Sequence, residues 1–218
     1  PFSYDALNQL VAITDTLGGT IGLTYDPNGN LLTVTDPRGS VTRYTYDSMD
    51  RVATRTDPLL RAESFQYDLG GNLTQVTDRK GQVTTLSYDA LSRPTQAAFA
   101  DASTITYSYD AGHRVTQIVD SLSGTITRAY DTLDRLLAET TPQGTVSYAY
   151  DAAGRRTSMT VAGQPPVAYT YDPADRLIQL TQGTSSVSLA HDAASRRTTL
   201  TLPNGVVVEY EYDGASQL

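Results

Sequence analysis

The amino-acid sequence predicts an all-β fold: an antiparallel β-ribbon of tandem repeats of about 21 residues that curls into an open barrel or spiral. Three observations support this prediction. A Tyr-Asp pair returns at a nearly constant period, apolar and polar residues alternate before each pair, and turn-forming residues follow it. A fixed short period indicates one small unit stacked on copies of itself, because core positions of an ordinary domain fall at irregular intervals.

The Tyr-Asp pair occupies eleven registers, beginning at Tyr4-Asp5 and including one His191-Asp192 variant. Successive registers lie 21 residues apart, except for two steps of 20. We therefore expect a single repeat array over residues 1–218, with incomplete repeats at both ends. The structural repeat positions are Tyr25, Asp26, Tyr46, Asp47, Tyr67, Asp68, Tyr88, Asp89, Tyr109, Asp110, Tyr130, Asp131, Tyr150, Asp151, Tyr171, Asp172, Tyr212 and Asp213.

Each repeat begins with a strand that has one apolar face. Ile21, Leu23 and Tyr25 alternate with Gly22 and Thr24, and the same period of two precedes most other Tyr-Asp pairs. Alternation of β-branched and aromatic residues with small polar ones is typical of a strand that is covered on one side.

A turn of four to five residues follows each strand. Asp26 is suited to open it because its carboxylate can accept backbone N–H groups, and Gly29, Gly71 or Gly154 can supply a positive φ near its end. A second short strand (31–35 or 73–77) then leads into another turn, such as the Asp-Pro-Arg-Gly of residues 36–39. Connections this short permit only antiparallel neighbours.

Successive tyrosines should lie two strands apart, roughly 9.5 Å, which is too far for their rings to stack. We expect residues of the intervening strands to fill these gaps and form an alternating aromatic and aliphatic stripe. The candidates are Leu31, Leu73, Leu136 and Leu177.

The composition excludes several classes of function. The net charge is −8 and Lys80 is the single lysine, so we expect no nucleic-acid partner. There is no cysteine for a disulfide or thiolate metal site, and no apolar run long enough for a membrane span.

A Tyr-Asp pair followed by two variable residues and Gly-Arg or a relative, with Thr-Asp-Pro-x-Gly turns between, resembles the YD repeats of the Rhs (rearrangement hotspot) family. That family includes bacterial polymorphic toxins, shell components of Tc toxins and animal teneurins. The resemblance implies a β-ribbon that spirals into a hollow shell around a C-terminal toxin domain, which is commonly released by self-cleavage at an Asp-Pro-x-Gly-Leu motif. Asp26 and Asp36 stand in Asp-Pro-x-Gly turns that lack this leucine, so no cleavage is assigned to them. The absence of cysteine favours the bacterial branch over the teneurins.

No residue pattern indicates an enzyme, a cofactor or a metal. His191 replaces a repeat tyrosine and His113 lies in a turn, and neither has a nucleophile beside it in a recognisable motif. Asp26, Asn28 and Asn30 have the alternate spacing of a calcium loop but lack its glycine and its distal glutamate. Aspartate–arginine pairs four residues apart are expected to form ion pairs across turns: Asp47–Arg51, Asp89–Arg93, Asp110–Arg114, Asp131–Arg135, Asp151–Arg155 and Asp172–Arg176.

Three functional hypotheses remain. The first is a non-catalytic structural segment of a secreted bacterial β-shell, whose partners are further repeats of the same longer chain and an enclosed toxin domain. The second is a bacterial cell-surface adhesion or carbohydrate-binding module. It requires an open aromatic groove, for which the candidates are Tyr44, Tyr107, Tyr148 and Tyr169. The third is a filament formed by pairing of exposed strand edges.

Overall fold

The computed structural model describes residues 1–217, and within them it contains 21 β-strands and no helix. Contacts divide the chain into two compact units. The first unit comprises Pro1–Tyr107 with Asp120–Leu122, and the second comprises Ser108–Val119 with the residues from Ser123 onward.

The strands have nearly constant lengths and spacing. The first eleven are β1 (Phe2–Tyr4), β2 (Leu10–Thr14), β3 (Thr20–Tyr25), β4 (Leu31–Thr35), β5 (Val41–Tyr46), β6 (Val52–Thr56), β7 (Ala62–Tyr67), β8 (Leu73–Thr77), β9 (Val83–Tyr88), β10 (Pro94–Ala98) and β11 (Thr104–Tyr109). The other ten are β12 (Val115–Asp120), β13 (Gly124–Tyr130), β14 (Leu136–Thr141), β15 (Gly144–Tyr150), β16 (Arg156–Val161), β17 (Val167–Tyr171), β18 (Leu177–Gln182), β19 (Ser185–His191), β20 (Arg197–Thr201) and β21 (Val207–Glu209).

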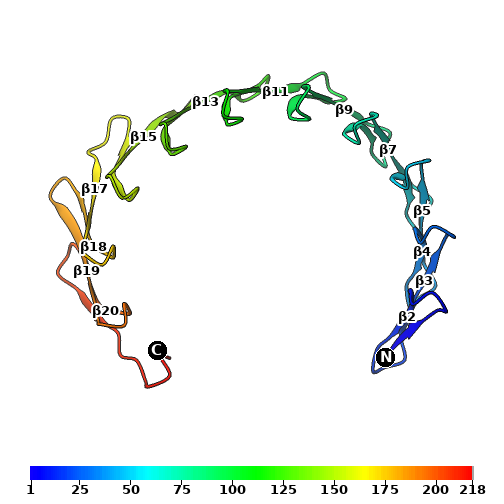
Figure 1. Ribbon diagram of the computed structural model, residues 1–218, viewed down its shortest axis with the longest axis horizontal. Coiled ribbons are helices and arrows are strands. Elements are labelled where there is room, and N and C mark those ends of the chain that lie inside the picture. The colour runs from blue at the N-terminus through cyan, green and yellow to red at the C-terminus, as the bar shows by residue number, and fades with distance from the viewer. Residues whose placement is uncertain (218) are drawn as a thin grey trace. The chain divides into compact units, whose positions relative to one another are not determined.

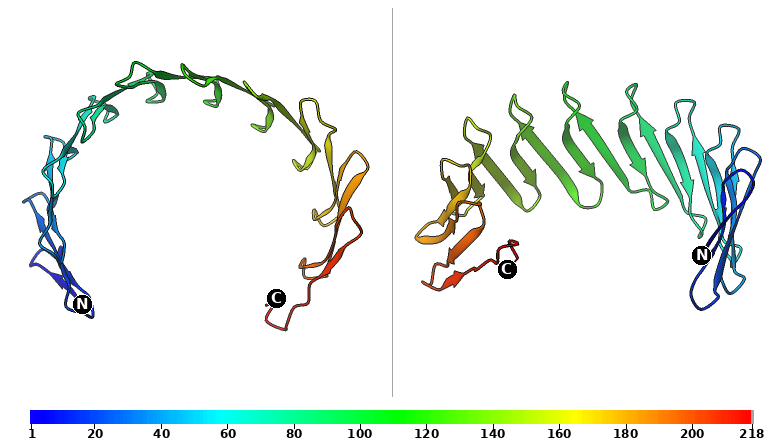
Figure 2. Two further views of the ribbon diagram at one scale, coloured as in Figure 1. Left: turned by 180° about the vertical axis from the view of Figure 1, so that it is seen from behind. Right: turned by 60° about the horizontal axis from the view of Figure 1, so that its bottom comes forward.

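Strands pair antiparallel in chain order from β1 to β11 and from β13 to β21. Figure 1 shows that the ribbon of each unit is curved, and Figure 2 shows its hairpins side by side with their turns on two opposite edges. The predicted all-β antiparallel ribbon is therefore confirmed.

A β-bulge recurs beside the repeat tyrosine. In the β3–β4 hairpin, Tyr25 stands opposite Leu31 while Thr24 stands opposite Thr33, so Leu32 is the extra residue. The same register shift occurs at Tyr46, Tyr67, Tyr130, Tyr150 and Tyr171. A bulge bends its strand and increases the local twist, so repeating it in each hairpin favours curvature of the ribbon.

The turns fall into two sets. Tyr-Asp turns follow the odd-numbered strands and have five residues, as in 26–30, where the Asp26 N–H donates to the Asn30 carbonyl at 2.9 Å. Return turns follow the even-numbered strands. They also have five residues in 15–19, 36–40, 57–61 and 78–82, but two residues in 142–143 and 183–184. Each two-residue turn is flanked by strands one residue longer than those of the first repeats. The net loss of one residue accounts for the two steps of 20 in the sequence.

The two faces of the ribbon differ as the alternation predicts. Ile21, Leu23 and Tyr25 are half-buried on one face, and Thr24 is exposed on the other. On the polar face, hydroxyl groups of threonines on paired strands are hydrogen-bonded, at 2.6 Å for Thr24 with Thr33. Such cross-strand pairs stabilise a sheet whose second face is open to solvent.

The ribbon is one layer thick, so burial is partial almost everywhere. Of the described residues, only Ala97 and Asp57 count as buried, at 8% and 5% exposed. The apolar side chains of one repeat are thus covered by the neighbouring repeats and not by a second layer of structure. This is the condition in which a repeat depends on the copies beside it.

Candidate functional site

The Tyr-Asp turns form the most regular side-chain arrangement of the molecule. Asp47 opens its turn: carboxylate Oδ1 accepts the backbone N–H groups of Met49 at 2.8 Å and Arg51 at 3.1 Å. Its Oδ2 accepts Nε of Arg51 at 2.8 Å and lies 2.7 Å from Nη2. The hydrogen bond from the Arg51 side chain, with those from the backbone, holds the pKa of Asp47 below its ordinary value despite opposing desolvation.

All the predicted aspartate–arginine pairs are present, and each arginine donates through Nε or Nη2 to its own aspartate. Asp192–Arg196 adds a further pair of the same kind. Carboxylate and guanidinium are both mostly covered, at 26% and 23% exposed for Asp47 and Arg51. These pairs are therefore less screened by solvent than exposed surface pairs.

The same arginines also reach the next repeat, which the sequence analysis did not foresee. Arg51 donates from Nη1 to the carbonyl of Asp68 at 3.0 Å, and its guanidinium carbon lies 4.6 Å from the centre of the Tyr67 ring. This cation–π contact recurs for Arg114 over Tyr130, Arg135 over Tyr150, Arg155 over Tyr171 and Arg196 over Tyr212, at 4.8 to 4.9 Å. The signal in the sequence was an arginine 15 or 16 residues before a repeat tyrosine.

Each tyrosine in turn binds the preceding repeat. The Tyr46 hydroxyl donates to the carbonyl of Leu31 at 2.8 Å, and burial is the main cause that raises its pKa. The equivalent bond joins Tyr25 to Leu10, Tyr67 to Val52, Tyr88 to Leu73, Tyr130 to Val115, Tyr150 to Leu136, Tyr171 to Arg156 and Tyr212 to Arg197. The expected leucines do stand opposite the tyrosines, as Leu31 does with Tyr25, but the stripe prediction omitted the guanidinium groups beside the rings.

The fourth residue of the Tyr-Asp turn also takes part in contacts between successive turns. The fourth residue of each Tyr-Asp turn has a positive φ, supplied by Gly29, Gly71 and Gly154 as predicted. Asp134 and Asp175 also adopt it, and each accepts Nη1 of the arginine one repeat earlier, Arg114 or Arg155, at 2.6 Å. A non-glycine residue in this conformation is strained, and the hydrogen bond offsets that strain.

In each unit the predicted repeat positions are joined by contacts between neighbouring repeats, a set that we call the Tyr-Asp ladder: the repeat tyrosine, the aspartate and the fourth and fifth residues of each Tyr-Asp turn. The repeat tyrosines end odd-numbered strands, except Tyr212, which lies beyond β21. Each aspartate opens a turn in which its N–H donates to the fifth residue's carbonyl, from Asp26, Asp47, Asp68, Asp89, Asp110, Asp131, Asp151, Asp172 and Asp213.

Some rungs of the ladder differ. Asn30 replaces the arginine, and its amide donates to Oδ2 of Asp26 at 3.0 Å and to Asp50 at 2.7 Å. Because the Asn28 amide also donates to Asp50, the residues with calcium-loop spacing are engaged in this rung. At His191 the ring takes the tyrosine position of β19, and its buried Nδ1 has no hydrogen-bond partner among the described residues. His113 occupies the positive-φ position of its turn.

Two arginines of the second unit contact tyrosines outside the ladder. The Arg156 guanidinium lies 4.8 Å from the Tyr148 ring and 5.8 Å from the Tyr169 ring, and the Tyr169 hydroxyl contacts the sulfur of Met159 at 4.0 Å. Arg197 lies 4.3 Å from the ring of Tyr210. Tyr148 and Tyr169, which the second hypothesis needed open in a groove, are thus half-buried and engaged by Arg156.

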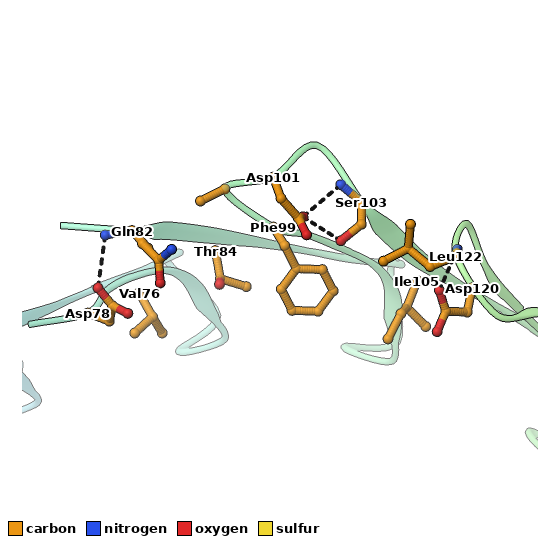
Figure 3. Close-up of a pocket in the computed structure, with 11 residues that line it drawn as sticks. Val76, Asp78, Gln82, Thr84, Phe99, Asp101, Ser103, Ile105, Asp120 and Leu122 are labelled. Atoms are coloured by element: carbon orange, nitrogen blue, oxygen red, sulfur yellow. Dashed lines mark hydrogen bonds between the residues drawn. The ribbon is translucent and has the colours of Figure 1, made fainter. Parts of the chain in front are cut away.

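The return turns contain two features that sequence reasoning missed. One is the ion-pair group around the nearly buried Asp57, whose Oδ2 lies 2.6 Å from Nη2 of Arg61 and 3.5 Å from Nη1 of Arg79. The other is a depression of about 430 Å³ at the turn that begins with Phe99 (Figure 3). Neither contains three or more histidine or acidic side chains placed to hold a metal ion, and no such group occurs elsewhere in residues 1–217. No helix within the same residues could cross a membrane.

These observations define a tandem-repeat β-ribbon in which successive turns are joined side chain to side chain. The family model for the RHS Repeat matches residues 4–37 and 25–61, and the model for the Teneurin YD-shell matches residues 60–218. The chain belongs to this YD-shell family. The predicted resemblance to Rhs-type YD repeats is confirmed.

Solved structures with a similar fold include Tc toxin complexes. The crystal structure of TcdB2-TccC3-TEV matches 99% of this chain and 13% of its own, with 16% identity and a TM-score of 0.74. A Photorhabdus luminescens Tc holotoxin pore with a TccC3 mutation matches 88% of this chain and 14% of its own, with 16% identity and a TM-score of 0.58. TcdB2-TccC3-Cdc42 matches 99% of this chain and 15% of its own, with 15% identity and a TM-score of 0.55.

At these identities the likeness is one of fold. The chain spans 13% to 15% of the length of those chains, so their assembled activities are not carried over to it directly. No curated protein matches the chain.

Proposed function

We propose that this chain is a non-catalytic structural segment of a secreted bacterial β-shell that encloses a toxin polypeptide and helps to deliver it. The observation that carries the proposal is the Tyr-Asp ladder, which joins each repeat to the next through side chains as well as through strand pairing. Membership of the YD-shell family and the fold likeness to Tc toxin complexes support the same function.

The chemistry of the ladder suits a wall. Arg51, Arg114 and Arg135 are each shared between their own aspartate, the next tyrosine and the next aspartate's carbonyl, as Arg114 shows with Asp110, Tyr130 and Asp131. A side chain that binds two repeats at once resists their separation, because opening one joint breaks several contacts together. We infer that Tyr25, Asp26 and their equivalents are structural positions, and that catalysis is not their role.

The partners in this proposal are further repeats of a longer chain and an enclosed polypeptide, in a protein secreted by or displayed on a bacterium. The carbohydrate-binding alternative is less well supported, because Arg156 already lies against the rings of Tyr148 and Tyr169. A glycan array probed with the wild-type chain and with a variant carrying Tyr44→Ala and Tyr107→Ala tests that alternative. It would be favoured by binding that disappears in the variant.

Limited proteolysis of the full-length protein that contains these repeats tests the shell function. We expect an enclosed segment to resist protease, and the double substitution Arg114→Ala and Arg155→Ala to speed its digestion by opening the ladder. The matched control is Arg38→Ala with Arg43→Ala, which removes two exposed arginines outside the ladder. The proposal fails if no segment outside the repeats is protected, or if the control and ladder variants digest that segment at the same rate.

A further inference from the structure

One return turn begins with an aromatic residue where the preceding return turns have aspartate. Phe99 stands at the position of Asp15, Asp36, Asp57 and Asp78. The backbone is unchanged, since the Phe99 N–H donates to the Ser103 carbonyl at 2.9 Å and the Ala102 N–H to Phe99 at 3.0 Å. The aspartate's own bonds are lost, and Asp101 replaces one of them by accepting the Ser103 N–H at 3.0 Å. Asp78 Oδ1, for comparison, accepts the N–H groups of Lys80 and Gln82 at 2.8 and 2.9 Å.

This turn is also strained. Ala102 has a φ of 65°, a left-handed conformation that is unfavourable for alanine and that the earlier turns mostly assign to glycine. Phe99 remains 38% exposed although it is a large apolar side chain. Phe99 places an exposed aromatic ring where the turn favours a hydrogen-bonding side chain. Departures of this kind from local sequence preference concentrate at functional sites.

The strand before the turn has a small, buried residue, Ala97. Ala97 stands opposite Leu86 and Ile105, at the repeat position that Val34 and Val76 occupy in earlier strands. The depression is about 430 Å³ and lies within the first unit, and Figure 3 shows the Phe99 ring projecting between Thr84 and Ile105.

Carboxylates line this depression on both sides of the aromatic ring. Asp78, Asp101 and Asp120 are among its lining residues, no lysine or arginine is, and Figure 3 shows Asp78 and Asp120 on opposite sides of Phe99. Hydrogen bonds from the Ser103 hydroxyl and backbone hold the pKa of Asp101 below its ordinary value, so its charge persists further into acid. An aromatic ring in a depression lined by carboxylates has the features that recognise an organic cation: a ring face for the cation–π contact and negative charge for the ion pair.

We propose that this depression, the Phe99 groove (Val76, Asp78, Thr84, Phe99, Asp101, Ile105, Asp120 and Leu122), binds the side chain of an arginine- or lysine-bearing polypeptide segment. The groove volume falls within the range of pockets that hold small ligands, and the aliphatic floor suits the methylene stem of such a side chain. A wall needs no such affinity, so the inference goes beyond the proposed function. Naming the segment as the enclosed polypeptide would rest on that function.

A peptide titration of the isolated chain tests the groove. The probe is a fluorescein-labelled tetra-arginine peptide, followed by fluorescence polarisation, and the matched neutral probe is the tetra-citrulline peptide. We expect the arginine peptide to bind at least about 10-fold more tightly, because citrulline keeps the shape and loses the charge.

Three variants locate the binding. Phe99→Asn supplies a turn acceptor at this position without adding charge, so it should fold at least as stably, and it should weaken arginine-peptide binding about 5- to 10-fold. Asp101→Asn with Asp120→Asn should weaken it about 10-fold. Glu209→Gln with Glu211→Gln removes the same charge at exposed positions remote in the sequence from the groove, and should change binding less than about 2-fold.

The groove proposal is overturned if Phe99→Asn binds as tightly as the wild type, if the glutamate control weakens binding as much as the aspartate pair, or if tetra-citrulline binds equally well. Thermal unfolding of each variant confirms that it is folded. Because the titration needs no enclosed polypeptide, its failure leaves the protease-protection result of the shell proposal intact, and the reverse also holds.

Discussion

The Tyr-Asp turns and the return turns lie on opposite edges of the ribbon, yet the Tyr-Asp turns keep one length and the return turns do not. Tyr-Asp turns have five residues from 5–9 to 213–217, with the same two backbone hydrogen bonds throughout. The first four return turns of the chain each start with an aspartate: Asp15, Asp36, Asp57 and Asp78. The next starts with Phe99, and later ones include two-residue turns and other forms.

The contacts of each set explain this difference. In a return turn such as 15–19, Asp15 binds the backbone N–H groups of its own turn, those of Leu17 and Gly19. In a Tyr-Asp turn the fifth residue must also fit the tyrosine and aspartate of the next repeat. A change of length in a Tyr-Asp turn would break its contacts with the neighbouring repeats. A return turn whose hydrogen bonds lie within the turn can be replaced by another turn that joins the same strands.

The largest effect we expect is acid unfolding, and it should act mainly through the Tyr-Asp turns. Arg51 holds the pKa of Asp47 low, and Arg196 does the same for Asp192, so the folded state binds fewer protons than the unfolded state in mild acid. Their stabilising contribution is complete above the unfolded pKa, near 4, and is lost as pH falls through the lower folded value. Urea unfolding between pH 2.5 and 7 should show a steep fall in stability below about pH 4.

Substitution locates this acid sensitivity. Asp131→Asn, which keeps the turn acceptor but removes the charge beside Arg135, should flatten the pH dependence more than Asp36→Asn in a return turn. Equal flattening by the two variants would contradict the comparison between the turn sets.

The next effect is the loss of one ladder tyrosine. Tyr130→Ala should cost about 2–3 kcal/mol, because it removes a half-buried ring, the hydrogen bond to Val115 at 3.0 Å and the contact with Arg114. Tyr130→Phe, which loses the hydroxyl alone, should cost about 1 kcal/mol. Leu17→Ala in a return turn, where the side chain is 95% exposed, should cost less than about 0.5 kcal/mol in the same urea titration. A similar cost for Leu17→Ala and Tyr130→Ala would mean that the ladder adds nothing.

A smaller effect tests whether return turns are independent of each other. A Cβ on Gly124 would lie 2.8 Å from Cγ of Pro142 in the next return turn, and its φ is +100°. Gly124→Ala should therefore cost about 2 kcal/mol. Gly39→Ala, at φ +83° and with no described atom within 4 Å of the new Cβ, should cost about 1 kcal/mol from conformation alone. Chemical denaturation of both variants measures the difference, and equal costs would show that these return turns do not constrain each other.

The smallest effect is a gain in stability. Leu60, in a return turn, has a φ of 61° and is 76% exposed, so Leu60→Gly should stabilise the chain by about 1 kcal/mol. Asp134→Gly relieves the same strain at φ 63° but removes the acceptor for Arg114 at 2.6 Å, so it should gain less. Thermal unfolding of the two variants compares them directly. If Asp134→Gly raises the stability as much as Leu60→Gly does, the hydrogen bond between Arg114 and Asp134 contributes nothing to the stability of the ladder.

Most of the local structure could be predicted because each signal lies within one repeat. The alternation of Ile21, Leu23 and Tyr25 defines a strand face, and Asp26 with Gly29 defines the turn that follows. The aspartate–arginine pairs could be predicted too, since four residues across a tight turn bring the two groups together.

Contacts between repeats could not be assigned in the same way. Whether the gap beside Tyr67 holds an aliphatic or a cationic side chain depends on where Arg51 points, and a long side chain has several rotamers that a sequence does not choose among. The Phe99 groove was missed for a similar reason. Phe99 by itself reads as an ordinary turn residue, and it forms a depression with Val76 and Ile105 only when neighbouring strands are in register.

The sequence by itself determined the period, the strand faces and the turn chemistry, because these follow from backbone preferences and short-range hydrogen bonds within about twenty residues. The tertiary structure decided the partners of each arginine and tyrosine hydroxyl, the strain accepted at Asp134 and the depression at Phe99. Those depend on strand register, and register is a property of neighbouring repeats taken together.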